Sequence, residues 1–380
     1  IRPFGRPLPW LSGMRHHAGD MGKRAADFLK NLLLVLASVL VSLALVEGAL
    51  GLALSYPALF AAPDGTPSSL LLILRNYHER AERRIVQFLP ECARWDGELT
   101  YTLKPGACEV ANREHTVRYA ANRLGLRDTD AALADPEIVV VGDSYAMGWG
   151  VAQDDAFPRR LAQSLGAPSL GAKVLNAAIS SYGTAREMIL LERLARESGA
   201  GAAPVLVIQY NDNDDEENRA YVAAGGRLAV TPEAAYRALV ERHAATFGYW
   251  PGKHVRGVAG LALVTIRRAG RPRADTTLDQ ARAFLDTLLL HRRQIEGRIV
   301  IVLVLTARER LGSGFLARAR ELVAQEPYRA LAPALSFLDL APLLGPQDFF
   351  VLDEHLNPTG HGRVAAALAG EIARRRQAAR

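Results

Sequence analysis

The chain has 380 residues, of which 49% are hydrophobic and 23% are charged, a composition typical of a globular protein that excludes a disordered one. Its net charge is +6, but many of the basic residues lie near the two ends, and no nucleic-acid-binding motif lies between them. We therefore expect no nucleic-acid partner.

The N-terminal part predicts a membrane anchor. Residues 1–27 are basic and are interpreted as a cytoplasmic tail or as upstream sequence, and residues 28–54 as a transmembrane helix in which Leu32–Leu54 carries Glu47 as its only charge. Basic residues crowd the N-terminal flank, which favours a cytoplasmic N-terminus and a globular part outside. With the Arg- and Ala-rich composition of a bacterial protein, this predicts a single-pass inner-membrane protein with a periplasmic domain and the lipid bilayer as a partner. A cleaved signal peptide is the alternative.

The only two cysteines, Cys92 and Cys108, fall on the exported side of this helix. Thiols in an oxidising compartment usually pair, and closing a loop of this length adds about 3 kcal/mol, so we predict a disulfide between them. Two unrelated buried thiols are the alternative. The spacing fits no complete metal site, and no metal ion or cofactor is predicted.

Residues 55–69 form a Pro-, Gly- and Ser-rich linker, and residues 70–135 predict a small, mixed, β-rich subdomain. Within it we expect a helical stretch around Arg75–Phe88 and short strands at Thr100–Leu103 and Thr116–Ala120. A turn containing Gly125 follows.

From residue 136 to residue 380, short apolar runs alternate with helical segments. The expected strands are Glu137–Val141, Lys173–Asn176, Pro204–Gln209, Arg298–Leu305 and Leu335–Leu338, and the expected helices are Asp155–Leu165, Thr184–Ser198, Thr277–Ile295, Gly314–Gln325 and Thr359–Arg375. Such alternation predicts an α/β domain with a parallel sheet covered by helices on both faces. Residues 218–275 interrupt it and predict an insertion or lid, whose aromatic residues Tyr236, Phe247, Tyr249 and Trp250 line a substrate groove or pack a helical insert.

Polar residues follow several of these strands, where an open parallel sheet binds its ligands. They are Gly142-Asp143-Ser144, Asn176 to Ser180, Asn211 to Asp214, and the loop from Asp353 to His361 before the last helix. We therefore expect these four segments to meet at one edge of the sheet.

This set contains the groups needed for nucleophilic catalysis. Ser144 would be the nucleophile, His355 the base that accepts its proton, and Asp353 the carboxylate that orients the imidazole. The backbone N–H groups of Ser144 and Ala178, with the side-chain amide of Asn213, would form an oxyanion hole. A helix N-cap is the plain alternative for Ser144. We expect His361 to pack structurally, Asp143 to brace the turn, and the acidic run Asp212–Glu217 to be a solvated loop rather than a cation site.

These blocks resemble the SGNH/GDSL hydrolase family in identity and order. Gly142-Asp143-Ser144 matches the GDS block, Asn213-Asp214 the G-x-N-D block, and Asp353 with His355 the final block. The resemblance implies a three-layer, flavodoxin-like α/β/α fold. The chain departs from the family at Ala178, where the second block carries a glycine, and at Asn211, where the third block does. Ser180 or Ser181 is the alternative donor to Ala178, and Asn211 is a further candidate for the hole.

The resemblance implies a serine-dependent esterase, or an O-acyl (acetyl) hydrolase or transferase, that acts on extracytoplasmic acylated carbohydrate through an acyl-enzyme on Ser144. A membrane acyltransferase is a candidate partner. The alternative is a catalytically degenerate domain that serves as a carbohydrate-binding or assembly module in the export of cell-surface polysaccharide.

Overall fold

The computed structural model describes residues 10–60, 67–165, 173–268, 276–307, 311 and 314–378, and gives the backbone alone for 10–23 and 265–268. Parts of three predicted segments lie outside the described residues. These parts are residues 1–9 of the tail predicted at 1–27, residues 61–66 of the linker predicted at 55–69, and residues 269–275 of the insertion predicted at 218–275.

A parallel five-stranded sheet forms the centre of the globular part. Its strands are β5 (Ile138–Val141), β6 (Val174–Asn176), β7 (Val205–Tyr210), β8 (Ile299–Val304) and β9 (Leu335–Leu338). They lie in the order β6-β5-β7-β8-β9, which is the order of a flavodoxin-like fold. Each strand begins and ends within two residues of its predicted bounds, because an apolar run buried on both faces is a strong strand signal.

Helices cover both faces of this sheet. They include α3 (Ser144–Met147), α4 (Phe157–Leu165), α5 (Thr184–Ser198), α6 (Asp214–Ala223), α9 (Thr277–Leu290), α10 (Arg292–Ile295), α11 (Phe315–Val323) and α12 (Pro358–Ala378). Alternate residues of β5 point to opposite faces: Val139 and Val141 join a core with α5, α9 and α11, whereas Ile138 and Val140 join a second core with α4 and α12. The predicted three-layer α/β/α fold is confirmed.

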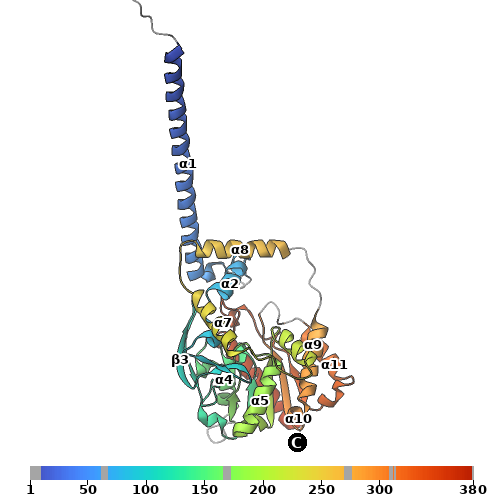
Figure 1. The fold of residues 1–380 in the computed structure, drawn as a ribbon. Helices are drawn as coiled ribbons and strands as arrows, with labels where there is room; N and C mark the ends of the chain where they lie inside the picture. Colours follow the sequence, from blue (N-terminus) through green and yellow to red (C-terminus); the bar gives the residue numbers. More distant parts are fainter. Residues whose placement is uncertain are drawn as a thin grey trace, which may run out of the picture.

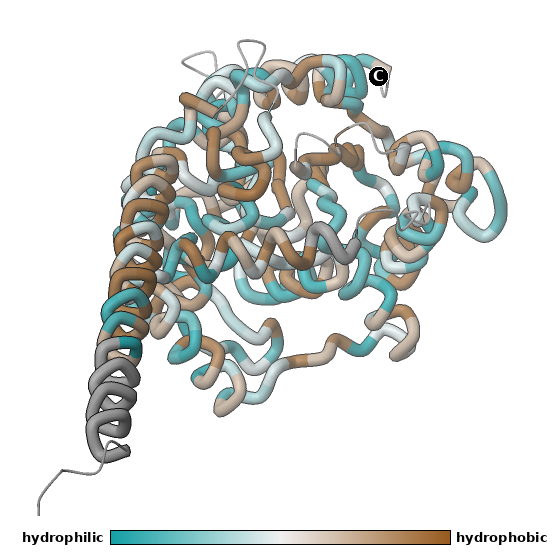
Figure 2. Tube along the Cα trace, turned by 90° about the horizontal axis from the view of Figure 1, so that it is seen from above, coloured by the Kyte–Doolittle hydropathy of each residue, from teal (hydrophilic) through white to brown (hydrophobic). Residues whose placement is uncertain are grey.

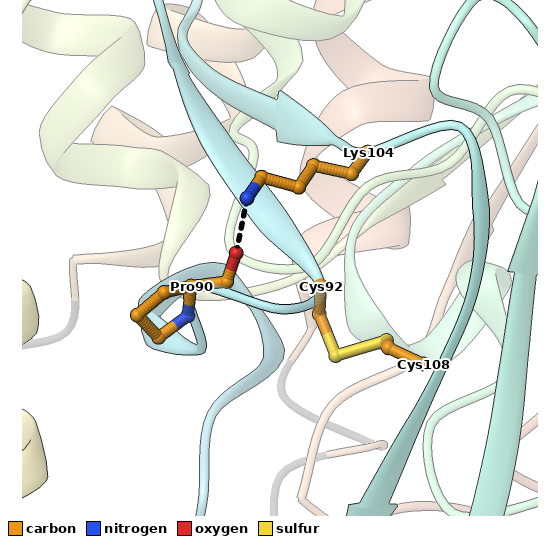
Figure 3. Close-up of a disulfide and its surroundings, with 4 residues drawn as sticks. All are labelled: Pro90, Cys92, Lys104 and Cys108. Carbon is orange, nitrogen blue, oxygen red and sulfur yellow. Dashed lines mark hydrogen bonds between the residues drawn. A yellow bond between two sulfur atoms is a disulfide. The ribbon is translucent and has the colours of Figure 1, made fainter.

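Two antiparallel hairpins precede the sheet. β1 (Ala93–Asp96) pairs with β2 (Thr100–Leu103), and β3 (Gly106–Ala111) pairs with β4 (Thr116–Ala121). A disulfide joins Cys92, just before β1, to Cys108 in β3, and so links the two hairpins, as Figure 3 shows. The Lys104 ammonium donates to the Pro90 carbonyl beside it.

The helix expected around Arg75–Phe88 lies elsewhere in part: α2 spans Ser69–Ala81, and a short 3-10 turn, η2, covers Val86–Phe88. Other 3-10 turns are η1 (Pro57–Phe60), η3 (Asp130–Leu133), η4 (Gln153–Asp155), η5 (Ala200–Ala202), η7 (Tyr328–Leu331) and η8 (Pro346–Asp348). The Ser68 side chain begins α2 by accepting from the backbone N–H of Leu71.

The first helix, α1 (Trp10–Ser55), leaves the globular part as a single long rod (Figure 1). Its section from Arg24 to Ser55 is long and apolar enough to cross a membrane, which fits a single-pass span or a signal sequence. The described side chains from Phe28 to Val46 are exposed, whereas Glu47, Ala53 and Leu54 are buried against the globular part. The predicted transmembrane helix at 28–54 lies within this section, and its last residues also contact the globular part.

Two helices from the predicted insertion complete the fold. α7 (Glu233–Ala245) packs near η2, and α8 (Lys253–Arg268) contacts α1 and α2. Figure 1 shows α8 lying transverse to α1 at its base, and Figure 2, seen from above, shows α8 crossing that face of the globular part. Tyr236 is buried, while Tyr249 and Trp250 are exposed.

Candidate active site

Ser144 stands at the turn that leads from β5 into α3. The turn is tight, because a Cβ at Gly142 would lie 2.6 Å from Oε1 of Gln209 and 2.7 Å from the Cβ of Ala146. Asp143 caps α3 by accepting the backbone N–H of Tyr145 at 2.9 Å. Ser144 is therefore the first residue of α3, and the cap is Asp143.

Buried polar groups from two other segments hold this turn. Oε1 of Gln209, on the neighbouring strand β7, accepts the backbone N–H groups of Asp143 at 3.0 Å and Ala146 at 3.2 Å. The buried guanidinium of Arg127 donates to the carbonyl oxygens of Met147 at 3.0 Å and Val151 at 2.7 Å, just beyond Ser144. The nucleophile candidate thus sits on a backbone with few alternative conformations.

The structure brings Ser144, His355 and Asp353 together. The Ser144 Oγ lies 2.7 Å from Nε2 of His355, and Nδ1 of the same ring contacts Oδ1 of Asp353 in a short hydrogen bond. Because Nδ1–H donates to the carboxylate, Nε2 is the nitrogen left to accept the Ser144 hydroxyl proton. This is the geometry in which an imidazole can activate a serine.

The charge of Asp353 is stabilised by several partners. Burial would raise the pKa of this carboxyl, but the nearby His355 and Arg83 outweigh it and hold the pKa well below its usual range. An Arg83 guanidinium nitrogen lies 3.6 Å from Oδ1, and the Trp149 indole N–H donates to Oδ2 at 2.9 Å. Asp353 therefore stays ionised and can fix the tautomer of the imidazole.

Aromatic rings and a distant carboxylate position the loop around His355. The imidazole contacts the rings of Tyr145 and Trp149, with centroids 4.5 and 5.5 Å away. Glu114, in the turn between β3 and β4, accepts three consecutive backbone N–H groups of this loop, at 2.7–2.8 Å, from residues 351 to 353. The predicted β-rich subdomain therefore contributes directly to the site.

The structure gives the backbone N–H of Ala178, predicted as an oxyanion donor, another partner. Its backbone N–H points to the side chain of Asn176, with a distance of 3.1 Å to Oδ1, and Ala178 is fully buried. Ser181 has φ of +59° and lines the pocket beside Ser144, and within the described residues its N–H donates to no other group. A positive φ is the conformation that favours glycine, and it turns the backbone at Ser181 beside the pocket.

Both predicted asparagines reach the pocket. Nδ2 of Asn211 donates to Oδ2 of Asp143 at 2.8 Å, so this amide braces the turn as Asp143 itself was expected to do. Nδ2 of Asn213 lies 3.5 Å from the same oxygen, a weaker contact that leaves Asn213 freer than Asn211 to turn toward an oxyanion. The candidate hole therefore combines the N–H groups of Ser144 and Ser181 with the Asn213 amide.

The acidic run Asp212–Glu217 is not the solvated loop that we expected. Most of it forms the first turn of α6, where the helix dipole favours negative charge. Asp214 is fully buried and accepts the Thr184 hydroxyl at 2.9 Å, and Glu217 pairs with Arg186 at 2.7 Å. Burial, and then the neighbouring Asp214, raise the pKa of Glu187 well above its usual range.

His361 lies within the fold and away from Ser144. Its ring is buried at the start of α12, and Nδ1 accepts the backbone N–H of Phe157 at 3.2 Å. Burial lowers its pKa to about 3, so it remains neutral. Its contacts agree with the structural role expected from the sequence.

A pocket of about 240 Å³ opens over Ser144 and His355. Its wall is largely polar and includes Glu79, Arg83, Ser180, Ser181, Asn211, Asp212 and Asn213. Sequence reasoning missed Arg83 and Glu114, which lie far from every motif. Trp149 carried a weak signal, since it follows Ser144 by five residues in the same turn.

Comparisons with known proteins gave structural matches alone. No protein-family model matches the chain, and no curated protein does. A psychrotrophic esterase, EstA, from Pseudoalteromonas is 12% identical, with 62% of this chain and 96% of that chain covered and a TM-score of 0.37. A carbohydrate esterase family 2 enzyme from Corynascus thermopiles (Myceliophthora fergusii) is 14% identical, with coverages of 63% and 66% and a TM-score of 0.35.

A putative lipolytic protein of the G-D-S-L family from Desulfitobacterium hafniense is also similar, with 14% identity, coverages of 61% and 97%, and a TM-score of 0.30. The sheet order and the places of the four motif blocks at its edge carry the conclusion on the fold. The chain therefore has the three-layer, flavodoxin-like α/β/α fold that its sequence predicts.

Proposed function

We propose that this protein is a serine ester hydrolase that removes small acyl groups through an acyl-enzyme on Ser144. The observation that carries the proposal is the hydrogen-bonded series from Ser144 through His355 to Asp353, with 2.7 Å between Oγ and Nε2. A degenerate module would have no need to keep these three groups buried, aligned and braced from a separate subdomain. The intact geometry therefore favours an enzyme.

The reaction would proceed in two steps. Oγ of Ser144 attacks the ester carbonyl carbon while Nε2 of His355 takes the hydroxyl proton, and the carbonyl oxygen becomes an oxyanion held by the proposed hole. The carbon–oxygen bond of the ester then breaks, and the leaving alkoxide takes the proton from the imidazolium. In the second step a water molecule loses a proton to Nε2 and attacks the acyl-enzyme, which releases the acid and restores Ser144.

We further propose an acylated carbohydrate as the substrate, with acetyl as the acyl group. The pocket is small, and its wall offers hydroxyl, amide and charged groups that can bind sugar hydroxyls. An extracytoplasmic location is supported by the basic flank of α1 and by the disulfide, which persists in oxidising compartments. A sugar hydroxyl in place of water in the second step would make the enzyme an O-acyltransferase.

The test compares Ser144→Ala with Ser198→Ala, a matched change near the end of α5. We expect S144A to lose labelling by a fluorophosphonate and to lower kcat for p-nitrophenyl acetate by about 10⁴-fold or more, with S198A unchanged. Labelling that persists in S144A would refute the nucleophile.

A second assay identifies the acceptor. Wild-type protein is incubated with an acetylated xylo-oligosaccharide and an unacetylated acceptor of different length, and the products are weighed by mass spectrometry. Free acetate alone is expected for the hydrolase, and acetyl on the acceptor would show transfer.

A further inference from the structure

Three helices meet at the base of α1 through buried polar contacts. The Glu47 carboxylate of α1 accepts the backbone N–H groups of His254 at 3.1 Å and Val255 at 2.9 Å, which belong to the first turn of α8. The His254 ring in turn contacts the Tyr77 hydroxyl of α2, with 2.9 Å between Nδ1 and the oxygen. These bonds satisfy N–H groups that the start of a helix leaves without partners.

A glycine brings α8 directly onto α2. A Cβ at Gly257 would lie 2.2 Å from the ring of Tyr77, so any larger residue there would separate the two helices. Beside this contact, Ala53 and Leu54 of α1 pack with Leu71 and Leu74 of α2 in a small apolar core. The transverse direction of α8 relative to α1 (Figure 1) is therefore set by buried contacts on both helices.

The exposed length of α1 places α8 at a defined height. The exposed section from Phe28 to Val46 is apolar apart from Lys30 and Asn31, and it is followed by Glu47, which is buried under the start of α8, and later by Leu52, which is exposed again. At about 1.5 Å per residue this section is roughly 28 Å long, close to the ~30 Å hydrocarbon thickness of a bilayer. If α1 crosses a membrane, the surface of that membrane lies at the level of α8.

The composition of α8 and the turn before it suits such a surface. Tyr249 is 67% exposed, Trp250 45% and Leu263 57%, and the Arg256 guanidinium lies 5.9 Å from the Trp250 ring centroid. The sequence holds no Asp or Glu between Glu241 and Asp275. Within α8 itself the sequence holds four basic residues, Lys253, Arg256, Arg267 and Arg268, of which Lys253 is buried and Arg256 is exposed. Exposed aromatic and leucine side chains beside an exposed arginine, on a helix without acidic residues, are typical of helices that lie on anionic lipid.

We propose that α8, with Tyr249 and Trp250, is an interfacial membrane helix that lies on the lipid headgroups of the leaflet facing the globular part. The occupant of this exposed face is the bilayer itself, and anionic headgroups pair with its basic residues. α2 connects this region to the pocket, because its Leu71 and Leu74 pack on α1 and its Glu79 lines the pocket wall. The protein is thereby held to the membrane at two points, which fixes the orientation of the pocket relative to the lipid.

The test places a single fluorescent label on α8 in the full chain. The chain's two cysteines form the disulfide, so Leu263→Cys can be labelled alone with an environment-sensitive nitrobenzoxadiazole probe. The matched control is Arg329→Cys, an exposed residue before β9 and so at the end of the sheet opposite the site. Both proteins are reconstituted in vesicles of phosphatidylethanolamine and phosphatidylglycerol.

We expect the emission of the label at 263 to shift to the blue, headgroup-region nitroxide lipids to quench it, and its quenching by aqueous iodide to be several-fold weaker than at 329. Equal iodide quenching at the two positions would overturn the proposal. Protection of 263 in native membranes but not in pure lipid vesicles would also overturn it and indicate a protein partner. Replacing phosphatidylglycerol with phosphatidylcholine should weaken the shift, and an unchanged shift would refute the pairing with anionic headgroups. The readout does not depend on ester turnover, so it is independent of the proposed function.

Discussion

Glu114 offers a sharp test of how the site is held together. Glu114 lies in the β3–β4 hairpin, which carries no motif residue. Its carboxylate accepts the backbone N–H groups of Val351, Leu352 and Asp353. In the variant Glu114→Ala these three N–H groups lose their acceptor, and the loop that presents Asp353 to His355 is released. We expect lower stability and lower activity, although residue 114 does not contact Ser144.

The size of the effect follows from the number of bonds. A hydrogen bond to a charged acceptor contributes about 1.5–3 kcal/mol, and the loop is half-buried, so the lower value applies and three bonds give roughly 4.5 kcal/mol. Part of this loss appears as a lower melting temperature. If a third or more of this free energy is lost from the transition state because Asp353 is displaced, kcat/KM falls by about tenfold or more, since ~1.4 kcal/mol corresponds to a factor of ten.

The assay measures kcat/KM for p-nitrophenyl acetate and thermal unfolding of the same preparations. Glu109→Ala is the matched control, because Glu109 carries the same charge in the same hairpin and is exposed. We expect E109A to behave as wild type in both measurements. An E114A protein with wild-type kcat/KM would refute the reasoning, since the Asp353 loop would then keep its position without this carboxylate.

Three further predictions concern the hole, the buried acid and the disulfide. Ser181→Gly keeps the backbone N–H and relieves a left-handed conformation that costs about 1–2 kcal/mol, so its kcat should stay within a few-fold of wild type. Ser181→Pro has no backbone N–H and should lose activity. The pKa of Glu187 is higher in the folded state than in the unfolded state, so the wild-type protein loses stability as the pH rises above the unfolded-state pKa of about 4.3. The variant Glu187→Gln has no such carboxyl, so its gain in unfolding free energy over wild type, measured in urea, should grow from pH 4 to pH 8. A gain that does not change with pH would contradict this. Cys92→Ser with Cys108→Ser should cost about 3 kcal/mol of unfolding free energy, measured against untreated wild type, and no loss would mean that the hairpins are held by packing alone.

The sheet, and the meeting of Ser144 with His355 and Asp353, could be predicted from the sequence for physical reasons. A strand buried on both faces, such as Val205–Tyr210, must be a continuous apolar run, and the helices between such runs dictate parallel pairing. Ser144 could be predicted because it directly follows a buried strand, and His355 because it lies in the loop before the last helix. Both places are at the carboxyl edge of the sheet, where polar groups gather.

The remaining site residues depend on geometry that no local pattern encodes. Whether Ala178 or Ser181 points its N–H into the pocket is decided by one backbone bend, with φ of +59° at Ser181, and by the Asn176 side chain that occupies the N–H of Ala178. Arg83 and Glu114 act across more than 200 residues of sequence separation. A single charged residue at such a distance gives no signal in one sequence.

The short hairpins before the sheet are more than a spacer between α1 and the α/β domain. Besides Glu114, they supply Tyr101, whose hydroxyl donates to the Ser180 carbonyl beneath the proposed hole. A shortened protein that began at β5 would retain serine, histidine and aspartate, yet lack the partners that hold their backbones in place. An α/β domain separated from these hairpins should therefore lose the geometry of the site, and one that keeps both hairpins should retain it.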